Sequence, residues 1–151
     1  MKTYTENEIA RLQDNLLLIR QAGSWSAEEF GEMIGVTKQT ISNLENKKTV
    51  MSKTQYIAIR AVLDYEIAER KDDQVLASTV NLCLNKENLS EDDRKKAQAF
   101  VSGATKAGLD SAAVVAGLAT LVGMTAMELL ASPIVIGATS AWIAKLLKGK
   151  K

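Results

Sequence analysis

The stretch that decides the fold is SAEEFGEMIGVTKQTISNLENKKT, residues 26–49. Its apolar residues recur at helical spacing in two short runs. Gly35 and Val36 separate the two runs and predict a tight turn between them. We therefore expect two short helices, the second beginning at Thr37. The apolar residues that would face the core are Phe30, Met33, Ile34, Ile41 and Leu44.

Local capping signals support these helix starts. Ser26 with Glu29 three residues later forms a capping box, in which each side chain bonds a free backbone N–H of the other residue. The Thr37 hydroxyl can cap the second helix. Gly31 has no Cβ and permits a close approach between the helices. A further capping box at residues 52–55 predicts the start of another helix.

Polar side chains and positive charge gather on the second helix of the stretch. Net charge is only +1, but residues 37–53 carry four lysines against a single glutamate. This distribution suits a surface that meets phosphates. Two helices in this arrangement are typical of a helix-turn-helix, in which one helix braces and the next enters the DNA major groove. The alternative is an ordinary solvated helix face. The outward residues are Lys38, Gln39, Ser42, Asn43 and Asn46.

Residues 12–64 resemble the Cro/cI (Xre-type) helix-turn-helix family of phage repressors and bacterial regulators. The resemblance is carried by Arg20, by the run SAEEFGEMIGVTKQTISNLEN and by the apolar positions of the helix that follows. It implies a structural ion pair between Arg20 and Glu45. It implies base contacts by Lys38, Gln39 and Asn43, side chains that can pair with guanine or adenine edges. The residues assigned to the DNA backbone are Thr40, Ser42, Asn46, Lys47 and Lys48.

Two positions depart from the family pattern. Ala27 stands where the family often has a phosphate-contacting Gln, which removes one backbone contact. Lys47 stands where the family usually has Gly, so the helix must end without glycine.

The remaining pattern is helical throughout. We expect one helix over residues 6–22 ending at Gly23, and a helix from Ser52 to about residue 71. A helix is expected over residues 74–84, although the alternation within it also suits a short strand. The prediction is an all-α protein: an N-terminal four-helix Cro/cI-like helix-turn-helix domain, residues 1–71, and a C-terminal apolar, Ala/Gly-rich helical module, residues 72–151.

The C-terminal module allows three interpretations. From residue 112 to residue 144 the sole charged residue is Glu128, and we expect Pro133 to divide the run into two helices. The segment could form a self-associating helical core, because small residues permit close packing. It could instead sit in a membrane through residues 111–147, with a lysine-rich tail at the surface. It could also receive a peptide or protein partner. The small residues are Ala113, Ala116, Gly117, Ala119 and Gly123.

Composition excludes several classes of site. The chain has one cysteine, Cys83, and no histidine, which excludes an intrachain disulfide and a Cys/His zinc site. We expect Cys83 to be a buried small hydrophobe. No nucleophile–base constellation or phosphate-binding glycine loop is present, so we expect neither catalytic residues, nor a metal, nor a cofactor. The polar N-terminus predicts no signal peptide, and the reducing cytoplasm is the expected compartment.

The sequence thus predicts a sequence-specific DNA-binding transcriptional regulator, more specifically a repressor. We expect it to bind double-stranded DNA as a dimer or higher oligomer, with the helix at about residues 37–46 in the major groove. Two alternatives remain: an antitoxin-type or partner-binding regulator, and a membrane-associated DNA-binding protein held by residues 111–147.

Overall fold

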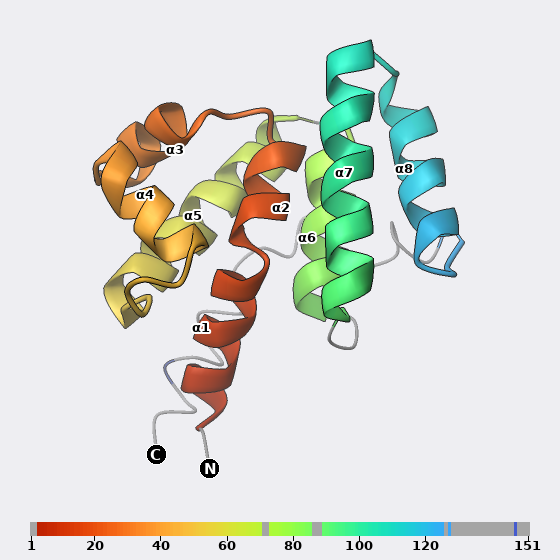
Figure 1. Cartoon of the computed structure of the whole chain (residues 1–151). Coiled ribbons are helices and arrows are strands. Elements are labelled where there is room, and N and C mark those ends of the chain that lie inside the picture. The colour runs from red at the N-terminus through yellow and green to blue at the C-terminus, as the bar shows by residue number, and fades with distance from the viewer. Residues whose placement is uncertain (1–2, 71–72, 86–88, 126, 128–146, 148–151) are drawn as a thin grey trace.

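The computed structural model describes residues 3–70, 73–85, 89–125, 127 and 147 (Figure 1). Every regular element over these residues is an α-helix, which confirms the all-α prediction. The helices are α1 (Tyr4–Asp14), α2 (Leu16–Ala22), α3 (Ala27–Ile34), α4 (Lys38–Glu45), α5 (Lys53–Glu69), α6 (Val75–Asn85), α7 (Glu91–Ala107) and α8 (Ser111–Leu121).

Helices α1 and α2 form a central column between two groups of helices. In Figure 1, α3, α4 and α5 lie on one side of this column and α6, α7 and α8 on the other. Helices α1 and α2 contact members of both groups. One apolar cluster runs through all of them, from Ile41 and Ile59 through Leu16 to Val101 and Leu118. The described helices on either side of residues 71–72 therefore share a core. The division into domains at that point stays a prediction.

The single helix expected over residues 6–22 is wrong, because the chain breaks at Asn15. This residue has φ −107° and ψ 9°, outside the helical range, and is 2% exposed. Its amide Nδ2 donates to the Arg11 carbonyl at 2.8 Å, and its Oδ1 accepts from Arg94 Nε of α7 at 3.1 Å. A partner from a distant helix thus fixes the break between α1 and α2.

The starts of α3 and α5 follow the predicted capping boxes. Ser26 Oγ accepts from the Glu29 N–H at 3.0 Å, and the Glu29 carboxylate accepts from the Ser26 N–H at 2.8 Å. The box at residues 52–55 has the same reciprocal bonds. Helix α6 is confirmed in place of the alternative strand. Cys83 on it is 2% exposed, as expected of a buried hydrophobe.

The first part of the apolar C-terminal run packs into the core. Helix α8 buries Val114, Val115 and Leu118 against α6 and α7. A Cβ on Gly117 would lie 2.3 Å from Phe100 Cζ, so the glycine leaves room for the Phe100 ring of α7. Within the described part of the chain, no helix is long and apolar enough to cross a membrane. The predictions for Glu128 and Pro133 lie outside the described residues.

Candidate nucleic-acid interface

The turn between α3 and α4 is fixed by two glycines. Gly35 adopts φ 97°, in the left-handed region that favours glycine, and its N–H donates to the Gly31 carbonyl at 2.8 Å. The Val36 N–H donates to the same carbonyl at 2.8 Å. A Cβ on Gly31 would lie 2.7 Å from the Val36 oxygen. The turn therefore sets the angle at which α4 leaves α3.

Helix α4 has one buried and one exposed side. Ile41 and Leu44 are 0% and 1% exposed and pack into the same core as Phe30. The Thr37 hydroxyl caps the helix by accepting from the Thr40 N–H at 3.1 Å. Burial of the inner side and the fixed turn together hold the outer side toward solvent.

The residues predicted to contact bases lie together on that outer side. Lys38 and Gln39 are exposed, and Asn43 is half-buried one turn further on. Gln39 Nε2 donates to Asn43 Oδ1 at 3.0 Å, so the two amides form a bonded pair. The i,i+4 spacing on a helix brings such side chains within reach of each other. Their contact with bases stays a prediction.

Of the residues predicted to meet the DNA backbone, Thr40 and Ser42 lie half-buried along α4. Asn46 follows the helix, and its Nδ2 donates to Ser42 Oγ at 3.3 Å. Lys47 and Lys48 are exposed in the loop after the helix. The structure brings all of these residues to α4 and its C-terminal end.

Lys47 ends α4 in the backbone conformation that glycine usually adopts at this position. Its φ is 60°, a left-handed backbone conformation that residues other than glycine rarely adopt. The Lys47 N–H donates to the Leu44 carbonyl at 3.2 Å, and the Lys48 N–H to the Asn43 carbonyl at 2.9 Å, which satisfies two carbonyls of the last turn. The Lys47 ammonium lies 2.6 Å from Asp14 Oδ1. The Lys47 ammonium group is therefore paired with a carboxylate of α1.

Arg20 and Glu45, assigned to a structural ion pair, join α2 to the end of α4. Arg20 Nε and Nη2 donate to the two Glu45 carboxylate oxygens at 2.5 and 3.0 Å. Arg20 Nη1 also donates to the Trp25 carbonyl at 3.0 Å.

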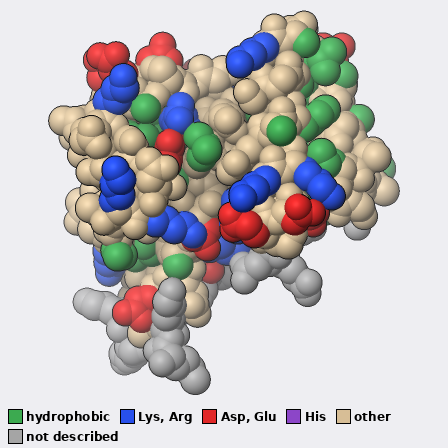
Figure 2. Space-filling view, viewed as in Figure 1, with side chains coloured by type: hydrophobic (Ala, Val, Ile, Leu, Met, Phe, Trp, Pro, Cys, Tyr) green, Lys and Arg blue, Asp and Glu red, His purple; other side chains and the backbone are tan. Residues whose placement is uncertain are grey.

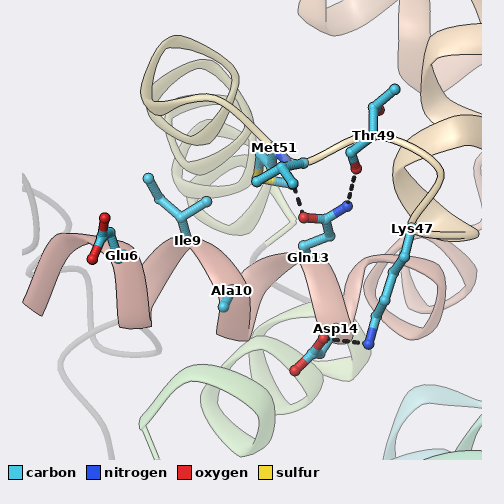
Figure 3. Close-up of a pocket in the computed structure, with 9 residues that line it drawn as sticks. Glu6, Ile9, Ala10, Gln13, Asp14, Lys47, Thr49 and Met51 are labelled. Atoms are coloured by element: carbon cyan, nitrogen blue, oxygen red, sulfur yellow. Dashed lines mark hydrogen bonds and ion pairs between the residues drawn. The ribbon is translucent and has the colours of Figure 1, made fainter. Parts of the chain in front are cut away.

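Gln13 contacts the end of α4, although sequence reasoning did not single it out. Figure 3 shows it on α1, directed at the loop after α4 and bonded to Thr49 and Met51. Its Nε2 donates to the carbonyls of Leu44 at 2.9 Å and Thr49 at 2.8 Å, and its Oε1 accepts from the Met51 N–H at 3.0 Å. On the sequence it is one polar position of an amphipathic helix, and nothing local distinguishes it.

An open groove of about 460 Å³ lies beside Gln13, between α1 and the same loop. Ile9, Ala10 and Met51 supply much of its apolar wall, and Val50 at its edge is 86% exposed. The charged residues that line it are Glu6, Asp14 and Lys47.

The surface charge around this region is mixed. Figure 2, in the same view as Figure 1, shows Lys and Arg side chains beside Asp and Glu side chains over α3 and α4. Exposed Glu28, Glu29 and Glu32 belong to α3, whereas exposed Lys38 begins α4. The positive charge is thus local to α4 and the following loop. Over the described residues, no group of three or more Cys, Asp and Glu side chains could hold a metal ion.

Comparison with protein families assigns the class of this region. Residues 16–70 match the family model described as helix-turn-helix, of the Cro/C1 type, which confirms the resemblance. This segment therefore belongs to the Cro/C1-type helix-turn-helix family. The domain supports a DNA-binding regulatory role for the chain. Comparisons with curated proteins and with solved structures found no match.

Proposed function

We propose that the protein is a sequence-specific transcriptional repressor that inserts α4 into the major groove of double-stranded DNA. The observation that carries this is the exposed face of Lys38, Gln39 and Asn43 on a helix held at both ends. Lysine donates to guanine O6 and N7, and the amides of Gln and Asn pair with adenine. A regulator of cellular DNA in this class would act in the cytoplasm.

We further propose that it acts as a dimer or higher oligomer. One helix-turn-helix makes a small interface, and two half-sites a helical turn apart are the usual route to useful affinity. The C-terminal module is the proposed site of self-association. Helix α8 supports this with an uncharged outer side on which Ala112, Ala113 and Ala116 are exposed.

The test is selection of binding sites from random duplex DNA, followed by competition binding to the selected site. Lys38→Ala and Gln39→Ala should each relax base preference by about 1–3 kcal/mol, the usual value of one good base contact. Lys106→Ala, an exposed lysine of α7, is the matched control and should keep the wild-type preference. Wild-type selectivity in both α4 variants would rule out α4 as the reading helix.

A partner-binding regulator of antitoxin type is the second candidate. The observation in its favour is the apolar groove between α1 and the loop after α4, with Val50 86% exposed at its edge. Exposed apolar surface of this kind suits a protein contact. Recovery of a stoichiometric second protein with the full chain, lost in Val50→Asp, would favour this function.

A further inference from the structure

Gln13 lies outside the segment that matches the helix-turn-helix family, yet it bonds the end of α4. We infer that Gln13 is a positioning residue for the reading helix α4. By holding the end of α4, it sets the base preference at the base pair that Asn43 faces. This inference rests on the proposed function, because it assigns a role in base reading.

The bonds of Gln13 use its whole amide group. Both Nε2 hydrogens go to carbonyls, of Leu44 in the last turn of α4 and Thr49 in the loop, and Oε1 accepts from the Met51 N–H. Gln13 is 8% exposed, and its bonds to Leu44 and Met51 are buried. One side chain therefore fixes α1 to the end of α4 and to the segment that leads into α5 (Figure 3).

Helix α1 is itself held from its other side. Arg11 Nε donates to the Cys83 carbonyl of α6 at 3.0 Å, and α1 packs against α6. Gln13 thus connects α4 to a helix that is braced on the C-terminal group of helices. Because α1 is itself held in place, its bonds to α4 can fix the position of the α4 C-terminal end.

The two ends of α4 have separate anchors. The N-terminal end is fixed by the glycine turn, where the N–H groups of Gly35 and Val36 bond the Gly31 carbonyl. The C-terminal end is fixed by Gln13 and by the Arg20–Glu45 pair. If the Gln13 bonds are lost, the Arg20–Glu45 pair still ties α4 to α2, but the tie to α1 is gone and the C-terminal end of α4 can shift about the turn. Because a helix rises about 1.5 Å per residue, a pivot displaces Asn43 more than Lys38 or Gln39.

This geometry predicts a position-specific loss of selectivity. The Asn43→Ala variant first identifies the base pair at which loss of Asn43 weakens discrimination between bases. In Gln13→Met, which keeps the size of the side chain but removes its hydrogen bonds, discrimination should fall at that same base pair. The expected loss there is about fivefold or more, the lower end for one base contact. Discrimination at the base pairs identified by Lys38→Ala and Gln39→Ala should change less.

The experiment measures competition binding of the full chain to single-base-pair variants of the selected site. Val101→Ala is the matched control, because it removes packing from a fully buried residue of α7 that touches none of these bonds. Gln13→Leu, which also removes the hydrogen bonds and adds no buried charge, is the second variant should Gln13→Met fail to fold. Backbone amide NMR shifts of Gly35 and of residues 43–51 are recorded for every folded variant without DNA.

The outcomes separate the two proposals. Failure of the wild type to select any DNA would overturn the proposed function and with it this role of Gln13, even where the NMR shifts move. A selective wild type with Gln13 variants that weaken binding to all sequences equally, the result expected of Val101→Ala if it has any effect, would overturn the positioning role alone. Loss confined to the Asn43 base pair, with shifted amides at residues 43–51 and an unshifted Gly35, would support it.

Discussion

Arg20 donates to both carboxylate oxygens of Glu45, from Nε at 2.5 Å and from Nη2 at 3.0 Å. The Arg20 and Glu45 side chains are 17% and 9% exposed, so the pair is largely sheltered from solvent. A bidentate arginine–carboxylate pair fixes orientation as well as distance. It therefore holds the last turn of α4 against α2, close to where Gln13 holds the same turn against α1.

Removal of one partner from this pair should destabilise the protein. In Arg20→Met, Glu45 keeps its charge in a mostly buried position without a partner, and the free energy of unfolding should fall by about 2–4 kcal/mol. Urea unfolding followed by circular dichroism measures the change. Lys96→Met is the control: the Lys96–Asp92 pair is 60% and 80% exposed, and its loss should cost about 0.5 kcal/mol or less. Equal losses in the two variants would contradict the structural role of Arg20.

Helix starts could be predicted from the sequence because their signals are local. Ser26 and Glu29 are three residues apart, and the bonds they form depend only on the backbone between them. The same holds for the Thr37 cap and for the Gly35 turn. These signals, with the apolar spacing of Ile41 and Leu44, were sufficient to identify the exposed side of α4.

The break at Asn15 and the role of Gln13 could not be predicted in this way. Asn15 bonds Arg94 of α7, and Gln13 bonds carbonyls beyond the end of α4. In the sequence alone, both residues look like ordinary polar positions of an amphipathic helix. Their function depends on which distant backbone groups the fold brings to them, and a single sequence carries no local mark of that.

Two glycines should respond in opposite ways to substitution by alanine. Gly35 has φ 97°, and Gly35→Ala should lower the free energy of unfolding by about 1–2 kcal/mol through left-handed strain. Gly103 is an exposed residue inside α7, and a Cβ added to it would meet open space, so Gly103→Ala should raise the free energy of unfolding by about 0.5–1 kcal/mol. Thermal and urea unfolding of both variants provide the comparison. Destabilisation by Gly103→Ala would contradict the described packing of α7.

Cys83 should make stability fall at alkaline pH. Burial raises the pKa of its thiol from 9.0 to about 12, although nearby Arg94 and Arg11 act to lower it. Above pH 9 the unfolded thiol loses its proton while the folded thiol keeps it, so unfolding is favoured by about 1.4 kcal/mol per pH unit until about pH 12. The stability difference between wild type and Cys83→Ala should therefore shrink from pH 9 upward. A constant difference between pH 8 and pH 10.5 would contradict the burial of this thiol.

Lys47 and Lys48 are neighbours on the proposed DNA side, but they should contribute unequally to phosphate binding. Lys47 Nζ lies 2.6 Å from Asp14 Oδ1, whereas exposed Lys48 forms no ion pair among the described residues. Each lysine that neutralises a phosphate adds about 0.9 to the slope of log K against log salt. Lys48→Ala should lower the slope by about that amount, and Lys47→Ala by less than half of it, because Asp14 already neutralises Lys47.

Fluorescence anisotropy with a labelled duplex between 50 and 200 mM salt, the range over which such slopes are measured, provides the data. Asp14→Asn is the control, since it frees Lys47 and should raise both affinity and slope. Equal slopes in the two lysine variants would mean that the Lys47–Asp14 pair opens when DNA binds.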